Sequence, residues 1–196
     1  MFVDAVDFWT KIIAFLAVIF WQLYWWHTER IADREKPKTA PPSFIKNFNK
    51  AWPKLVGLIF FLQLLGLSIL PFQRTIEIQI MGLLLVLVGV GIGISARNTL
   101  GTNWTHATEY QIKKNHDLIT NGVYAYIRHP IYVSLILVYI GFEFILHSYL
   151  FILLGPVMFI SAYIQGRKEE KLLQEHFGNK YVAYMKKSKM LIPFIF

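Results

Sequence analysis

Five long apolar blocks alternate with short polar segments along this chain. The blocks cover residues 8–27, 55–72, 78–96, 131–147 and 149–165. Each is close to the length of about 20 apolar residues that an α-helix needs to cross the hydrocarbon core of a bilayer. Soluble cores are built from shorter amphipathic elements, so this pattern predicts an all-α, polytopic membrane protein with about five transmembrane helices.

Only Ser148 separates the fourth block from the fifth. We therefore expect these two helices to form a tight antiparallel hairpin. The start of the fourth block and the end of the fifth would then lie at the same membrane surface. In the third block, Gly89 and Gly93 are four residues apart and share one helical face, which favours close contact with a neighbouring helix.

Positive charge is distributed unevenly about the blocks. Of the 20 Lys and Arg residues, 18 lie in the segments after the first, third and fifth blocks, and only Lys11 and Arg74 lie on the other side. Cytosolic loops are enriched in Lys and Arg, so we expect the N-terminus outside and the C-terminus in the cytosol, in the cell membrane if the host is prokaryotic. Acidic residues precede the first block, which indicates a retained span rather than a signal peptide.

Composition narrows the function classes. The net charge of +8 is explained by Lys and Arg beside the membrane, so no nucleic-acid partner is expected. The chain has no cysteine, which excludes disulfides, thiolate metal sites and cysteine nucleophiles. His106, His116 and His129 lack the spacing of metal ligands, and no metal is expected. Glu143, an acid within the fourth block, is either a functional residue or one that points outward to the interface.

Two long segments are predicted on the cytosolic side. The loop 97–130 has 34 residues, and the tail after the fifth block has about 30. Loops of this length without a role are uncommon, so we expect loop and tail to form a small folded cap. The chain then divides into residues 1–96, with three N-terminal helices and a basic loop, and residues 97–196, with the loop, the hairpin and the tail.

The predicted hairpin brings two polar motifs together. Residues 128–130 (Arg-His-Pro) stand at the start of the fourth block, and residues 167–170 (Arg-Lys-Glu-Glu) follow the fifth. Pro130 suits the first turn of a helix. We therefore expect the side chains of Arg128, His129, Arg167, Glu169 and Glu170 to be neighbours. Taken separately, the first motif is also typical of a positive membrane anchor and the second of a solvated helix face.

These motifs resemble the isoprenylcysteine carboxyl methyltransferase family. The resemblance is carried by GVYAYIRHPIY at 122–132, the apolar hairpin, and RKEEKLLQEHFGNKYVAY at 167–184, with NWTH at 103–106 and HDLI at 116–119 upstream. It covers residues 97–196, about half of the chain, and is closest to small prokaryotic members. A wider group shares the pattern, including phospholipid N-methyltransferases and sterol reductases.

The resemblance implies an integral-membrane protein-S-isoprenylcysteine O-methyltransferase. Such an enzyme uses S-adenosyl-L-methionine, held in the cytosolic cap, and releases S-adenosyl-L-homocysteine. The substrate would be the C-terminal carboxylate of an isoprenylated cysteine, or a similar lipid-linked acid, that enters a monomeric enzyme from the bilayer. Methylation of a phospholipid or another lipid amine is the alternative within the same chemistry, and a non-catalytic membrane scaffold is the alternative outside it.

The family's site residues fall on defined positions of this chain. Arg128 and Arg167 are the candidates for binding the substrate carboxylate. Glu109 stands where eukaryotic members have Gln, and the spacing after Arg167 also differs, which leaves open which glutamate of the pair contacts the cofactor. The implied cofactor contacts are Glu109, His116, Asp117, Leu118, Ile119, Tyr124, His129, Pro130, Ile131, Tyr132, Glu169 and Glu170.

The implied chemistry agrees with the residue types. A C-terminal carboxylate has a pKa of roughly 3.5 and is ionised at neutral pH, so its attack on a sulfonium methyl group needs no general base. The protein must align the reacting groups and remove water from the anion. An amine nucleophile must lose a proton, and a base such as His129 would then be required.

Overall fold

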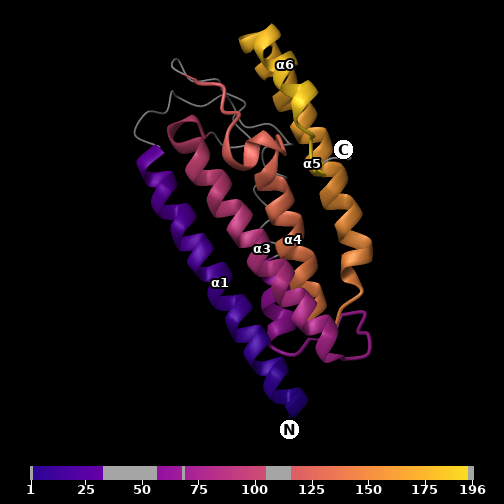
Figure 1. The fold of residues 1–196 in the computed structure, drawn as a ribbon. Helices are drawn as coiled ribbons and strands as arrows, with labels where there is room; N and C mark the ends of the chain where they lie inside the picture. The colour runs from indigo at the N-terminus through magenta and orange to yellow at the C-terminus, as the bar shows by residue number, and fades with distance from the viewer. Residues whose placement is uncertain (1, 33–56, 68, 105–115, 194–196) are drawn as a thin grey trace.

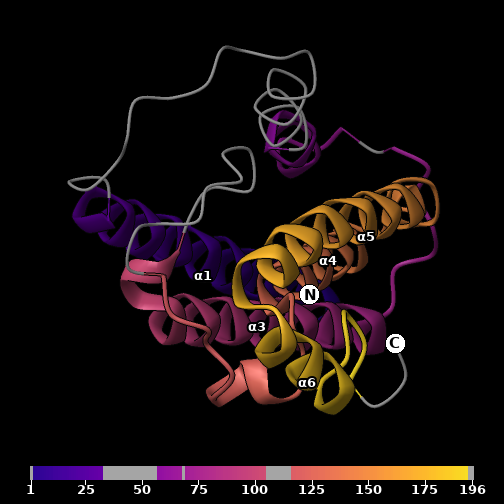
Figure 2. The same ribbon diagram turned by 90° about the horizontal axis from the view of Figure 1, so that it is seen from above.

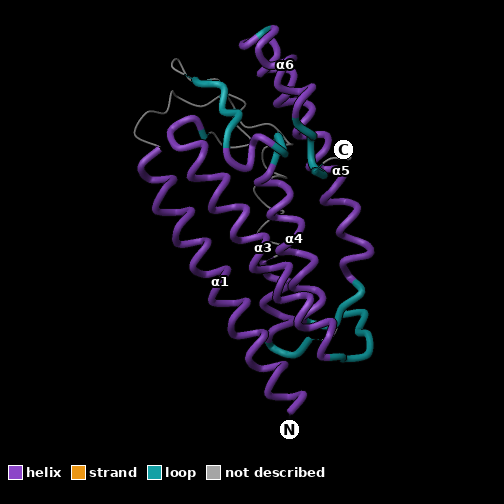
Figure 3. Tube along the Cα trace, viewed as in Figure 1, coloured by secondary structure: helices purple, strands orange, loops and turns teal. Residues whose placement is uncertain are grey.

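The computed structural model describes residues 2–32, 57–67, 69–104 and 116–193 (Figure 1). The predicted all-α fold is confirmed, because the described residues form helices joined by loops, with only two isolated β-bridges (Figure 3). In chain order the helices are α1 Phe2–Ala32, residues 57–64, α3 Ile76–Leu100, η2 Gly101–Asn103, η3 Gly122–Ala125, α4 Pro130–Ile145, α5 Leu150–Phe177 and α6 Asn179–Lys187.

Three of these helices are long and apolar enough to cross a membrane. The candidate spans are Asp4–Thr28, Ile76–Asn103 and Leu150–Phe177. α4 is also apolar, but its 16 residues fall short of the roughly 20 that span the hydrocarbon core. Large apolar side chains such as Phe20, Leu84 and Ile160 are more than half exposed, as expected for helices whose outer faces meet lipid.

The second apolar block is shorter as a helix than predicted. The block 55–72 was expected to be helical throughout, but the described helix ends at residue 64 and a turn follows at 65–66. The backbone beyond it pairs with the α4–α5 loop: Phe72 N donates to His147 O at 2.8 Å, and Tyr149 N donates to Leu70 O at 2.8 Å. This pairing satisfies backbone groups that a helix would otherwise have satisfied.

Glycines allow α3 and α4 to pack closely, which confirms the prediction for Gly89 and Gly93. A Cβ added at Gly89 would lie 2.9 Å from Ser134 O, and one added at Gly93 would lie 3.0 Å from Ser134 Oγ. Gly82 and Gly141 meet across the same interface, because a Cβ on either would lie 2.6 Å from the carbonyl oxygen of the other. The main core, which includes Trp21, Val86 and Phe142, joins α1, α3 and α4.

The predicted hairpin is present and sets the position of the polar motifs. Residues 146–149 join α4 to α5. α5 continues beyond the predicted span to Phe177, and Gly178, with φ 56°, separates it from α6. The start of α4, the polar half of α5 and α6 therefore lie at the end of the bundle opposite the N-terminus (Figures 1 and 2). The predicted division between residues 96 and 97 falls inside α3.

Candidate active site

The start of α4 is held by the C-terminal tail. His129 is the N-cap residue and Pro130 occupies the first helical turn, as predicted. Arg128 N donates to Lys189 O at 2.8 Å, and His129 N donates to Met190 O at 3.1 Å. The tail thus fixes the backbone that presents both side chains.

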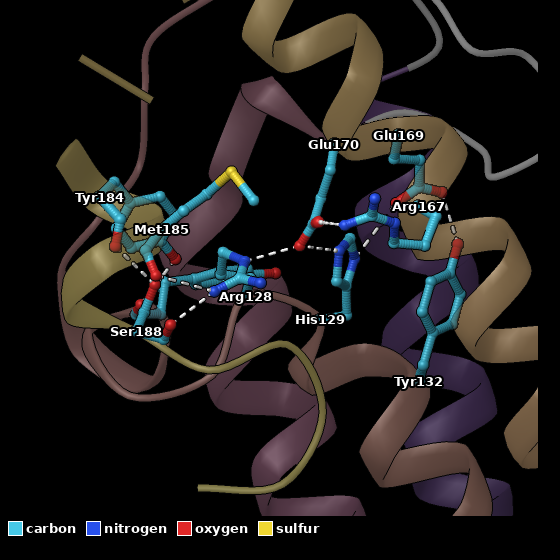
Figure 4. A network of polar contacts seen from close by, with 10 residues as sticks. Arg128, His129, Tyr132, Arg167, Glu169, Glu170, Tyr184, Met185 and Ser188 are labelled. Carbon is cyan, nitrogen blue, oxygen red and sulfur yellow. Dashed lines mark hydrogen bonds and ion pairs between the residues drawn. The ribbon is translucent and has the colours of Figure 1, made fainter. Parts of the chain in front are cut away.

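The two polar motifs meet as expected from the hairpin (Figure 4). Arg128 Nε donates to Glu170 Oε1 at 2.6 Å. His129 lies between the two acids, with Nδ1 3.4 Å from Glu169 Oε2 and Nε2 3.4 Å from Glu170 Oε1. Arg167 Nη1 is 3.8 Å from Glu170 Oε2. We call these five residues the α4–α5 cluster.

The surroundings of His129 favour its protonated form. Burial alone would lower the pKa of this imidazole, but the carboxylates of Glu169 and Glu170 beside the two ring nitrogens outweigh burial and raise the pKa above its usual value of 6.5. A protonated ring has two N–H donors, one for each carboxylate. His129 is therefore suited to orient the glutamates and poorly suited to act as a base.

The two arginines of the cluster differ in accessibility. The Arg128 side chain is 9% exposed, and its Nη1 donates to the backbone oxygens of Met185, at 3.3 Å, and Ser188, at 2.5 Å. The Arg167 side chain is 57% exposed. Arg128 therefore joins Glu170 to the tail, whereas Arg167 faces outward from the cluster.

The two glutamates also differ. Glu170 is 1% exposed and is held by Arg128, whereas the Glu169 side chain is 27% exposed. Tyr132 donates its hydroxyl to Glu169 Oε1 at 2.5 Å, and Gln165 Nε2 donates to the same oxygen at 3.3 Å. Both carboxylates are thus oriented by neighbours at the start of α4 and on α5.

The predicted cap is built from loop and tail. Ile127 and Lys189 form a parallel bridge, and the Tyr184 hydroxyl donates to Tyr124 O at 2.6 Å. Met190 and Leu191 are buried against apolar residues of α4 and α5. The sequence did not identify Met185, Ser188 or Met190 as partners of the cluster, because they act through backbone oxygens, which every residue has.

The predicted cofactor residues that precede the cluster in the sequence make contacts outside the cluster. His116 lies with its ring centre 6.0 Å from that of Phe177, near the end of α5. Asp117 N donates to Asn103 Oδ1 at 2.9 Å. Leu118 and Ile119 follow in the same non-helical segment, while Ile131 lies in the first turn of α4. Glu109 and His106 lie outside the described residues.

Two features fit a ligand that carries hydrogen-bond donors. Glu170 Oε2 is buried and accepts no hydrogen bond from the described residues, although Arg167 lies within ion-pair distance. The partly exposed carboxylate of Glu169 lies beside it. The arrangement suits a ligand with amino or hydroxyl groups.

Comparison with known proteins identifies relatives for this half of the chain. A sequence profile of the phospholipid methyltransferase family matches residues 78–180, a segment that contains the whole α4–α5 cluster. The protein-S-isoprenylcysteine O-methyltransferase of Schizosaccharomyces pombe is 33% identical over 102 residues, covering 52% of this chain and 43% of that protein. The Xenopus laevis enzyme of the same name is 34% identical, over 60% of this chain and 41% of that protein. The Homo sapiens enzyme is 30% identical, over 60% of this chain and 42% of that protein.

The fold is also shared. A solved structure of the eukaryotic intramembrane Ras methyltransferase, an isoprenylcysteine carboxyl methyltransferase, matches with a TM-score of 0.53 and 24% identity, covering 79% of this chain and 55% of the other. The present chain spans about two fifths of the length of the curated relatives cited above.

Proposed function

The chain belongs to the phospholipid methyltransferase family, and from this premise we propose that it is an integral-membrane, S-adenosyl-L-methionine-dependent carboxyl methyltransferase. Its substrate is the C-terminal carboxylate of an isoprenylated cysteine or a similar lipid-linked acid. One observation carries this proposal: the segment shared with the family contains both halves of the α4–α5 cluster. In that cluster the exposed Arg167 lies beside the carboxylates of Glu169 and Glu170.

The proposed setting follows from the charge distribution and the position of the cluster. The enzyme is a monomer in the cell membrane, with the N-terminus outside and the cluster at the cytosolic surface. A lipid-linked substrate reaches the cluster from the bilayer, and a soluble methyl donor reaches it from water. Nearly all of the Lys and Arg residues in the sequence support this orientation.

The acids of the cluster are the proposed holders of the methyl donor. Glu169 and Glu170 accept hydrogen bonds from its amino and hydroxyl groups, with His129 and Tyr132 keeping the carboxylates in place. The predicted contacts at Glu109, at residues 116–119 and at Tyr124 complete the set. When bound, S-adenosyl-L-methionine supplies a methyl group on a positively charged sulfur.

Arg167 is the proposed ligand of the substrate carboxylate. Its exposed guanidinium can bind an incoming acid through charge-assisted hydrogen bonds, whereas Arg128 already donates to Glu170 and to two backbone oxygens. Arg128 therefore acts as a positioning residue that holds Glu170 against the tail. The acid needs no general base, so orientation by Arg167 and exclusion of water supply what this chain adds to the transfer.

The proposal is tested by methyl transfer in lipid nanodiscs. Purified protein is supplied with S-adenosyl-L-methionine labelled on its methyl group and with either N-acetyl-S-farnesylcysteine or phosphatidylethanolamine. We expect label on the farnesylcysteine that is released by mild base, as for a methyl ester. Base-stable label on the amine lipid would instead show N-methylation, and absence of transfer to either would contradict the proposed activity.

A further inference from the structure

A buried acid lies at the end of the bundle opposite the cluster. Glu143 is in the last turn of α4, and its side chain has no exposed surface. The sequence left open whether this acid points outward to the membrane interface. Complete burial excludes that orientation, so the carboxyl group must be satisfied inside the protein.

The partner of Glu143 is an amide on the helix formed by residues 57–64. Gln63, which is itself buried, donates Nε2 to Glu143 Oε2 at 3.3 Å. Phe60, one turn earlier, stacks on Phe142 with the ring centres 5.1 Å apart. The acid–amide contact therefore lies in the interface between this helix and α4.

The second oxygen of each group makes no hydrogen bond of good geometry within the described residues. Glu143 Oε1 and Gln63 Oε1 are both buried, and neither makes a hydrogen bond with the described residues. An ionised carboxylate and an amide oxygen are both acceptors, so neither can satisfy the other. Within the described part of the chain, Glu143 also has no ion pair, in contrast to the acids of the cluster. A carboxylate left in this state would be costly inside a membrane.

We infer that Glu143 carries a proton on Oε1 and donates it to Gln63 Oε1. The acid and the amide then form a cyclic pair with two hydrogen bonds and no net charge. One proton satisfies both unpartnered oxygens and removes the charge from the bilayer. The pair is a neutral hydrogen-bonded contact that positions the helix formed by residues 57–64 on α4.

Asp7 provides an internal contrast. It also faces a glutamine, because Gln79 Nε2 donates to Asp7 Oδ1 at 2.7 Å. Its other oxygen, however, lies 2.9 Å from Lys11 Nζ and 3.5 Å from Arg74 Nη1. Two cations therefore supply the ion pairs that Glu143 lacks within the described residues. The two acids form a matched pair for an experiment.

The rival arrangement is a Glu143 anion that takes donors from two hydroxyls. Tyr139 and Ser148 are the other polar side chains around the carboxyl group. The Tyr139 hydroxyl is buried and makes no hydrogen bond within the described residues, and the Ser148 hydroxyl accepts from Leu150 N at 3.1 Å. Rotation of these hydroxyls toward Glu143 would support an ionised acid, which gives no protonated carboxyl band in the infrared.

Infrared spectroscopy of the full chain in lipid nanodiscs at neutral pH tests the inference. We expect the C=O band of a protonated carboxylic acid in the wild-type protein, retained in Asp7→Asn and absent from Glu143→Gln. We further expect Gln63→Leu to shift this band, because the acid loses its hydrogen-bonded partner. A wild-type spectrum without a protonated band that depends on Glu143, or a band unmoved by Gln63→Leu, would overturn the inference.

Thermal unfolding adds a second readout. Glu143→Gln keeps two amide hydrogen bonds to Gln63 and no charge, so its melting temperature should lie within a few degrees of the wild-type value. Gln63→Leu should melt clearly lower, since it leaves the acid without a partner. If Glu143→Gln instead melted as low as Gln63→Leu, the pair would require a charged acid and the inference would fail.

Discussion

At the scale of single residues, Arg128 and Arg167 carry the same charge in different surroundings. Arg128 is buried against Glu170 and the tail, and Arg167 is largely exposed. Their loss should therefore affect different ligands. Removal of a charged hydrogen bond costs about 1.5–3 kcal/mol, which corresponds to roughly tenfold to a hundredfold in affinity.

Arg167→Gln is expected to raise the KM for N-acetyl-S-farnesylcysteine by about tenfold or more and to leave the affinity for S-adenosyl-L-methionine nearly unchanged. Arg128→Gln should weaken cofactor affinity instead, because Glu170 loses its orienting partner, and Arg128→Lys should recover part of the loss. Steady-state kinetics measures the KM for the farnesylcysteine, and calorimetry measures the affinity for S-adenosyl-L-methionine, so the two effects are distinguished. A rise in the substrate KM alone in Arg128→Gln would assign the carboxylate contact to Arg128.

His129 makes a separate prediction about pH. Since its folded-state pKa lies above the usual value of 6.5, the protonated ring stabilises the fold at pH values below 6.5. That contribution should be lost as the pH rises through the folded-state pKa. The melting temperature in detergent should therefore fall across this range in the wild-type protein and fall less in His129→Gln. Equal pH dependence in the two proteins would show that His129 is not held protonated by the glutamates.

At the scale of elements, the α3–α4 contact depends on glycine. A Cβ at Gly141 would lie 2.6 Å from the backbone oxygen of Gly82, an atom that cannot move without separating the helices. Gly91, on the same α3 helix as Gly82, has no atom within 4 Å of an added Cβ. Alanine substitutions at Gly141 and Gly91 therefore distinguish the effect of helix packing on stability from that of helix propensity.

Gly141→Ala is expected to destabilise the fold by about 1–3 kcal/mol through overpacking. Gly91→Ala should be neutral or stabilising by up to about 1 kcal/mol, because alanine is the better helix former. Thermal or denaturant unfolding of both variants in one detergent provides the comparison. Equal effects would mean that the helices do not approach as closely as described.

The sequence predicted those parts of the architecture that depend on the length of apolar blocks and on short connections. The short connection at Ser148 was enough to predict that Arg128 and His129 meet Glu169 and Glu170. The early end of the second block had a local signal in Gly66, which adopts φ 100° just after the helix, but the apolar residues continue past it and hide this end. Beyond Gly66 the backbone pairs with residues 147–149. That pairing is a tertiary contact without a local pattern.

The same limit applies to the cap. The tail binds Arg128 through the backbone oxygens of Met185 and Ser188, and any side chain at those positions would present the same oxygens. Tyr184 and Tyr124 were visible as aromatics, but their contact depends on how α6 folds back on the loop. The sequence therefore predicted that loop and tail associate, and the structure supplied the contacts.

At the scale of the whole molecule, lipid-facing helices and the polar cluster have separate tasks. Exposed apolar faces on α1, α3 and α5 keep the chain in the bilayer. The long α5 carries the two acids beyond its apolar half and returns through α6 to hold the start of α4. A lipid-linked acid and a water-soluble methyl donor can meet only at the membrane surface, where lipid and water adjoin.

The central claim is that the α4–α5 cluster holds the methyl donor. Calorimetric binding of S-adenosyl-L-methionine to the solubilised full chain tests this claim most directly. Glu169→Gln and Glu170→Gln should each weaken binding by about tenfold or more, whereas Lys171→Gln, an exposed neighbour on α5, should bind within about twofold of the wild-type protein. Wild-type affinity in both glutamate variants, with folding verified by thermal unfolding, would contradict the account.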